Sequence, residues 1–169
     1  MKPIYAYGYF IVSLTGDFHQ IMIYEYIDTE EEFARALKTR LEEELEAMKN
    51  NMQSFLNEEI VKVNGVITKP RVILVNADFR GSLKRPFIEF LIHFRGDLIE
   101  GLNTYENIYE SEITTYDYSV VWIFPQNSEV VEADVGVEYE VKPKNVLRFS
   151  VKRGFRIPGY EKIVFRLVS

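Results

Sequence analysis

The stretch Thr29–Ile60, TEEEFARALKTRLEEELEAMKNNMQSFLNEEI, decides how this chain folds. Apolar residues recur in it at spacings of three and four, the period of one face of an α-helix. This stripe consists of Phe33, Leu37, Leu41, Leu45, Met48, Met52, Phe55, Leu56 and Ile60. Asp28 or Thr29 can cap the helix, and the glutamates that follow suit the positive end of its dipole. The sequence therefore predicts one long helix over residues 29–60, with a bend expected at Asn50-Asn51.

A β-hairpin is predicted before this helix. Residues 4–14 and 20–27 both alternate between two faces, as strands do. Thr15-Gly16-Asp17 between them has the composition of a turn. The chain should therefore enter the helix from two paired strands.

Everything after the helix has the pattern of strands. Asn64-Gly65 is a turn signal, and the apolar or alternating segments that follow are 71–79, 87–94, 107–124, 130–141, 146–151 and 162–168. Strands in runs, rather than strands alternating with helices, favour antiparallel pairing. We expect an α+β fold in which one long amphipathic helix packs on a curved, mostly antiparallel sheet, in the order ββα and then five or more strands. The length of 169 residues is typical of one domain, covering 1–169.

Composition excludes several classes of function. With 47% hydrophobic and 27% charged residues, the chain is not intrinsically disordered. Cysteine is absent and only His19 and His93 are present, which excludes disulfides, zinc–thiolate sites, cysteine nucleophiles and a three-histidine metal site. We therefore expect no metal and no cofactor. The many glutamates and the lack of cysteine resemble the composition of thermophile proteins.

The overall charge bears on partners and location. A formal net charge of −6 argues against nonspecific binding to nucleic acid or to anionic membranes. No run of eighteen apolar residues is present, so no membrane-spanning helix is expected. Lys2 and the apolar stretch after it can mimic a signal peptide, but alternating aromatics favour a strand. We expect a cytoplasmic protein.

Charge is also unevenly distributed along the chain. Residues 97–140 hold 11 acidic and no basic residues, whereas residues 141–169 hold 8 basic residues and one acid, Glu161. One interpretation is that the acidic segment forms a surface for cations and that the basic segment forms a site for anions. The interpretation that we favour is pairing between neighbouring strands, with Glu140 opposite Arg148.

Two groups of polar residues are weak candidates for a site. Arg80, Lys84 and Arg85 lie in a loop that can hold an anion, although a solvated hairpin tip explains them as well. The second group comprises possible pocket residues: Asp78, His93, Glu110 and Trp122. His93 can act as a general base beside a carboxylate, but a half-buried structural histidine is the simpler interpretation. No residue marks itself as a catalytic nucleophile.

Tyrosines are the most unusual feature of the N-terminal hairpin. Tyr5, Tyr7 and Tyr9 share one strand face, and we expect them to pair across the hairpin with Met22, Tyr24 and Tyr26. Tyrosine is enriched in protein interfaces and also provides a stacking plane with a hydroxyl group. This face can therefore be an interface, a ligand surface or part of the core.

Two functions remain open from the sequence. The first is a non-enzymatic binding or assembly module that self-associates, as a two-fold dimer, through Tyr5, Tyr7 and Tyr9. The alternative is a small-ligand-binding domain, or an enzyme without a recognisable motif, with an aromatic pocket between helix and sheet. Outward-pointing tyrosines favour an interface, whereas aromatics that converge inside with a polar group favour a pocket.

Overall fold

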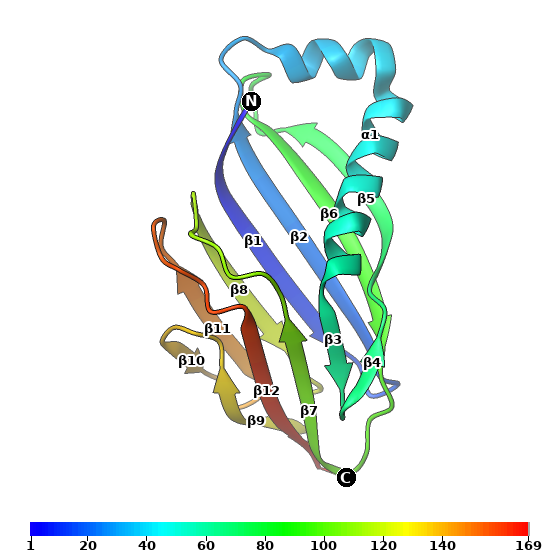
Figure 1. Ribbon diagram of the computed structural model, residues 1–169, viewed down its shortest axis with the longest axis vertical. Helices are drawn as coiled ribbons and strands as arrows, with labels where there is room; N and C mark the ends of the chain where they lie inside the picture. The colour runs from blue at the N-terminus through cyan, green and yellow to red at the C-terminus, as the bar shows by residue number, and fades with distance from the viewer. Residues whose placement is uncertain (169) are drawn as a thin grey trace.

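The computed structural model describes residues 1–168, which form one helix and two β-sheets (Figure 1). The strands are β1 (Lys2–Val12), β2 (Asp17–Ile27), β3 (Ile60–Val63), β4 (Val66–Thr68), β5 (Arg71–Phe79), β6 (Pro86–Arg95), β7 (Gly101–Ile108), β8 (Asp117–Ile123), β9 (Ser128–Asp134), β10 (Tyr139–Val141), β11 (Val146–Val151) and β12 (Tyr160–Leu167). The helix, α1, spans Glu32–Glu58 and follows β2. The α+β class and the order ββα followed by strands are confirmed.

The prediction of a single curved sheet is wrong, because the strands form two sheets. The larger sheet has the order β10-β11-β8-β1-β2-β6-β5, and the smaller has the order β4-β3-β7-β12-β9. The pairings are antiparallel except for β1 with β8, which run parallel. One helix cannot cover so many strands, and Tyr105, Ile163 and Phe165 give the smaller sheet an apolar face of its own. That face is buried by stacking on the larger sheet.

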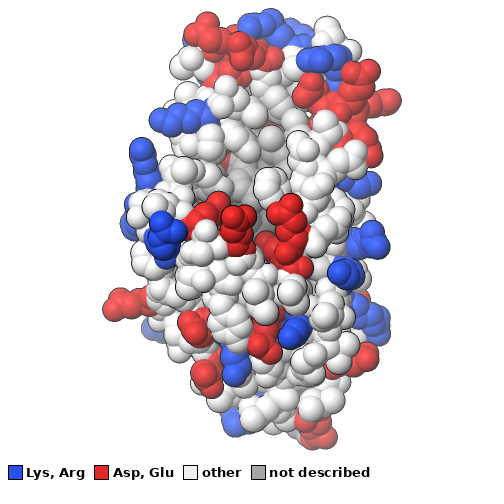
Figure 2. Space-filling model, viewed as in Figure 1, with Lys and Arg blue, Asp and Glu red and all other residues white. Residues whose placement is uncertain are grey.

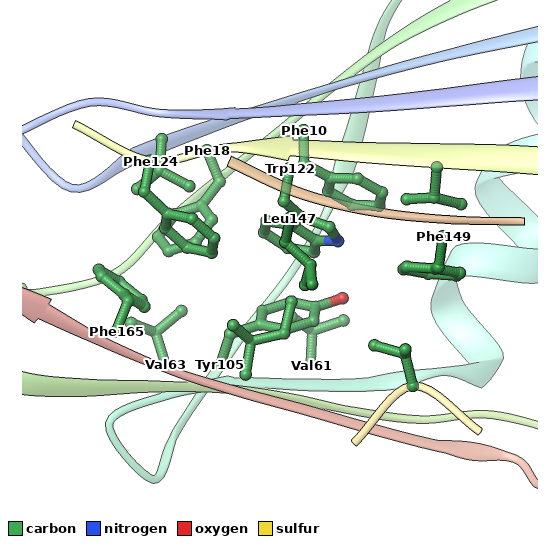
Figure 3. Packing of buried hydrophobic residues seen from close by; sticks show 14 of the residues in the cluster. Phe10, Phe18, Val61, Val63, Tyr105, Trp122, Phe124, Leu147, Phe149 and Phe165 are labelled. Atoms are coloured by element: carbon green, nitrogen blue, oxygen red, sulfur yellow. The ribbon is translucent and has the colours of Figure 1, made fainter. Parts of the chain in front are cut away.

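The main core lies between the two sheets. Trp122 is at its centre, fully buried, with its ring stacked on Phe10 at 4.0 Å and on Phe124 at 5.6 Å between centroids (Figure 3). Tyr105 and Phe165 close the core from the smaller sheet. Offset aromatic pairs of this kind add to the stabilisation from buried apolar area.

Helix α1 has its bend at Arg40, not at Asn50-Asn51. Arg40 has φ −142° and ψ 40°, which are not helical values. Asp28 is buried, and its carboxylate accepts a hydrogen bond from the amide of Phe33 at 2.8 Å, so it satisfies one free donor of the first turn. The bend allows Phe33 to reach Phe79 at one end of β5, with 6.2 Å between ring centroids, while Leu56 packs beside Val72 at the other end.

The smaller sheet covers only part of the larger one. Beyond it, the inner face of β1, β2 and β6 is faced by α1, which runs along the edge strand β5 (Figure 1). None of the described helices has the length and apolar character needed to cross a bilayer. The space between α1 and the inner face of the larger sheet is where a site can form.

Candidate functional site

A groove of about 530 Å³ lies between α1 and the inner face of the larger sheet. It is lined by Pro3, Gln20, Met22, Tyr24, Tyr26, Met48, Asn51, Met52, Phe55, Leu56, Glu59, Ile88, Phe90, Glu112 and Tyr116. The hollow is visible at the centre of the face shown in Figure 2. Its size and its mainly apolar lining, with a few polar groups, are typical of sites for small molecules.

The apolar stripe of α1 is only partly covered by the sheet, and Leu37, Met48 and Met52 pack against the buried residues without being buried themselves. Phe33, Ala34 and Leu56 are the buried residues of the helix, whereas Leu41 is 48% exposed and Phe55 is 66% exposed. The expected buried stripe is therefore only partly buried. Met48, Met52 and Phe55 of this stripe line the groove, whereas Leu41 does not.

Acidic side chains lie at the end of the groove nearest the smaller sheet. Glu59 follows the last turn of α1 and Glu112 precedes β8, and both line the groove. Glu161 lies on β12 on the same face as the buried Ile163 and Phe165, and it pairs in register with Asn107 on β7. Figure 2 shows acidic side chains at the lower rim of the hollow.

Four tyrosines surround these carboxyl groups. Tyr24 comes from β2, Tyr109 and Tyr116 from the segment between β7 and β8, and Tyr118 from β8. The rings of Tyr24 and Tyr116 are nearly perpendicular, with 6.5 Å between their centroids. We call Glu59, Glu112, Glu161 and these four tyrosines the acid–phenol cluster.

Burial and like charges perturb the ionisation of this cluster. Loss of solvent raises the pKa of Glu161 to about 7, helped by the charges of Glu59 and Asp134. Loss of solvent also raises the pKa of Glu59, although the hydrogen bond from Asn107 opposes this change. The pKa of Tyr118 is raised first by burial and then by the charge of Glu161. The end of the groove is therefore a place where negative charge is unfavourable without a counter-charge.

Hydrogen bonds hold part of the cluster in place. The side-chain amide of Asn107 donates to Glu59 Oε2 at 3.2 Å, while Asn107 Oδ1 is buried and has no hydrogen-bond partner. None of the ion pairs formed within residues 1–168 includes Glu59, Glu112 or Glu161. Glu59 thus accepts one hydrogen bond from Asn107, and no cation of the described chain pairs with the carboxyl groups of the cluster.

The structure divides the predicted tyrosine set between two faces. Tyr24 and Tyr26 line the groove, whereas Tyr5, Tyr7 and Tyr9 lie on the outer face of the larger sheet. Their partners across the hairpin are Glu25, Ile23 and Ile21, so the expected pairing with Met22, Tyr24 and Tyr26 is wrong. No other layer of the described chain covers these three outward tyrosines, which are each partly exposed.

The other candidates are not brought together. Trp122 is at the centre of the core, and Asp78 is exposed, where its carboxylate accepts a hydrogen bond from the Phe79 amide. His93 lies on the outer face, where its Nε2 is 2.8 Å from Asp17 Oδ1. Glu110 is exposed in the segment after β7.

The basic loop is partly engaged in other contacts. Arg80 pairs with Glu25 at 3.4 Å, and its guanidinium lies 4.0 Å from the centroid of the Phe87 ring. Lys84 and Arg85 are exposed in the β5–β6 turn. Near the C-terminus, Glu140 does lie opposite Arg148, as expected from strand pairing.

Sequence reasoning missed Glu59, Glu112, Glu161 and Asn107. One signal was present for Glu161, which is the single acid in the basic C-terminal segment and shares its strand face with Ile163 and Phe165. A carboxyl group in such a pattern is directed toward a core. Glu59 and Glu112 had no comparable signal, since both come from element ends whose position is set by the tertiary fold.

Comparisons with known proteins give little further guidance. No protein-family model and no curated protein matches the chain. Among solved structures, an aminopeptidase N family protein from Idiomarina loihiensis is 8% identical with a TM-score of 0.42, covering 94% of this chain and 29% of that one. The folded domain of Mycobacterium tuberculosis LppM, solved by NMR, is 7% identical with a TM-score of 0.41, covering 100% of this chain and 94% of that one. The chain thus spans less than a third of the aminopeptidase family protein.

Proposed function

We propose that this protein is a non-enzymatic binding module whose groove between α1 and the larger sheet takes an amphipathic small molecule. The observation that carries the proposal is the groove itself, with apolar walls and polar groups gathered at one end. Apolar walls supply most of the binding free energy, and a few polar groups fix orientation.

The residues that form the walls support this function. Met48 and Met52 on α1 face Met22 on β2, and methionine adapts to apolar ligands of different shapes. Phe55 stands at the mouth with two-thirds of its side chain exposed. A bound apolar molecule would cover these groups, which otherwise contact water.

A neutral fluorescent probe, N-phenyl-1-naphthylamine, tests the groove directly. We expect it to bind with enhanced fluorescence and to bind at least about tenfold more weakly to Met48→Trp, because the larger side chain fills the groove. The matched control is Ala47→Trp, which adds the same ring at the exposed neighbouring position and should leave the affinity unchanged. Equal affinities of the two variants, both folded by circular dichroism, would contradict the proposal.

A second candidate function, self-association, is favoured by the outer face of the larger sheet. Tyr5, Tyr7 and Tyr9 are flanked there by Ile21 and Ile23 on β2. Val121 on β8 and Leu91 on β6 extend the apolar surface on either side. Polar contacts lie at its margins, including the hydrogen bond between Asp17 and His93 and the ion pair of Asp117 with Lys152. An apolar centre with a polar rim is the usual anatomy of an interface.

The dimensions of this face bear on a two-fold dimer. The four strands β8, β1, β2 and β6 at about 4.8 Å spacing and seven residues at about 3.3 Å give roughly 19 Å by 23 Å. The corresponding area of about 440 Å² is about half of the roughly 800 Å² per partner of a standard interface, so a dimer would also have to bury the polar margins of this face.

Sedimentation of the wild type and of Tyr7→Glu tests the dimer. The carboxylate on the outer face should weaken dimerisation while the fold is retained. A protein that is monomeric at high micromolar concentration would rule out this second function and would leave the groove unaffected.

A further inference from the structure

We propose, on the premise that the groove binds a ligand, that this ligand is an organic cation. Its apolar part lies along Met22, Met48 and Met52, and its ammonium group lies at the end of the groove between Glu59 and Glu112. The assignment identifies the chemical class of the ligand of the proposed site.

Charge complementarity is the first argument. Glu59 and Glu112 line the groove at one end, and Glu161 lies close enough to Glu59 for their charges to interact. The charges that act on Tyr24, deep in the groove, are likewise acidic, including those of Glu59 and Glu112. Among residues 1–168, no lysine or arginine lines this groove. A carboxylate or phosphate head group would therefore meet repulsion here, whereas an ammonium group would supply the missing counter-charge.

Aromatic surfaces at the same end are the second argument. Tyr24 and Tyr116 meet nearly at right angles with 6.5 Å between their ring centroids, so they form an aromatic corner beside Glu112. The faces of aromatic rings attract cations, and pairs of such rings are a recurring way to bind alkylated ammonium groups. Apolar walls and phenol rings alone would accept neutral molecules equally well, so the carboxyl groups decide the preference.

The spacing of the carboxyl groups favours an organic cation over a metal ion. Within residues 1–168, no three acidic or histidine side chains converge closely enough to ligate one ion. Divalent metal ions need several oxygen ligands at short, uniform distances. A diffuse ammonium group on an apolar chain does not need this convergence and also uses the rest of the groove.

Three ligands with the same ten-carbon chain test the charge preference: decyltrimethylammonium, 1-decanol and decanoate. Each is used below the concentration at which it forms micelles, and its dissociation constant is measured by calorimetry and by displacement of N-phenyl-1-naphthylamine. We expect decyltrimethylammonium to bind at least about tenfold more tightly than decanoate at low salt, with decanol between them.

Two double variants separate the groove from the net charge of the protein. Glu59→Gln with Glu112→Gln should reduce the preference to within about twofold. Glu43→Gln with Glu46→Gln changes the net charge equally on exposed helix positions and should leave the preference intact. If the first pair impairs folding, Glu112→Gln alone, at an exposed residue, should still reduce the preference.

Each outcome decides between the two proposals. Equal affinities for the three ligands, or a preference that the Glu43 and Glu46 variants also remove, would overturn the cationic assignment while groove binding stands. If neither the probe nor any decyl ligand binds, or if Met48→Trp leaves binding of all of them unchanged, the groove function fails and the assignment fails with it.

Discussion

Replacing Glu161 by glutamine should stabilise the protein at pH 8 and change its stability little at pH 4. Burial raises the pKa of this carboxyl group from 4.5 to about 7, so the folded state favours its protonated form. Below about pH 4.5 both folded and unfolded chains carry the proton, and glutamine is a close mimic of the neutral acid. Above pH 7 the wild type must keep a carboxylate in a poorly solvated position, and the variant does not.

The size of the effect follows from the two pKa values. A raised pKa means that the folded chain binds more protons than the unfolded chain between pH 4.5 and 7, so the contribution of Glu161 to stability falls as pH rises through this window. Each pKa unit corresponds to about 1.4 kcal/mol, which gives at most about 3 kcal/mol above pH 7. Glu161→Gln should therefore gain up to about this amount at pH 8.

Urea unfolding of wild type and variant at pH 4, 6 and 8 measures this difference. The comparison removes the titration of other groups, and Glu138→Gln, at an exposed position, is the control for the loss of one carboxyl group from the surface. If Glu161→Gln changes stability equally at pH 4 and pH 8, or destabilises the protein at pH 8, the carboxyl group is not held in the environment described.

Three further changes test the packing around the site by urea unfolding. Leu56→Ala should cost about 2–4 kcal/mol because Leu56 is buried, whereas Leu41→Ala should cost less than about 1 kcal/mol because Leu41 is 48% exposed; equal costs would contradict the position of the helix. Gly96→Ala should cost about 1–3 kcal/mol or more, since its new Cβ would lie 2.4 Å from Val63 Cβ. An unchanged unfolding midpoint would show that Gly96 and Val63 are not packed this closely. Asp28→Ala should cost about 1 kcal/mol through loss of the hydrogen bond that its carboxylate accepts from the Phe33 amide, and no loss would mean that another group satisfies this amide.

Local patterns predicted the helix and most of the strands, but not all of their bounds and not their assembly. The segment 107–124 was expected to be one strand, whereas β7 ends at Ile108 and β8 spans Asp117–Ile123; the segment 130–141 is likewise divided between β9 and β10. The spacing of Phe33, Leu37 and Leu56 predicts a helix, and a helix is present. The bend at Arg40 has no sequence signal because it arises from where β5, a later segment, places the contacts for Phe33 and Leu56. The second sheet was missed for a similar reason, since alternation in a strand indicates a buried face and does not identify what buries it.

The groove illustrates the same limit for function. A stripe of apolar residues predicts that one side of the helix is covered, yet the central part of α1 faces a hollow. Whether protein or ligand fills such a space depends on how far the helix stands from the sheet. The polar end of the groove depends on Glu59, Glu112 and Glu161, which are separated widely in sequence and meet only in the folded chain.

The register of the first hairpin explains why the tyrosines serve two surfaces. Val12 pairs with Phe18 with five residues between them, so from Tyr5 to Val12 residues whose numbers add to thirty lie opposite each other and share a face. Tyr7 is therefore beside Ile23 on the outer face, while Tyr24 is beside Ala6 on the inner face. A loop shorter or longer by one residue would have exchanged the two faces of one strand. Because the two surfaces lie on opposite sides of one sheet, Tyr7→Glu should weaken assembly without reducing probe binding. Met48→Trp should reduce probe binding without affecting assembly. A variant that changes both properties would show that the two surfaces are coupled through the sheet.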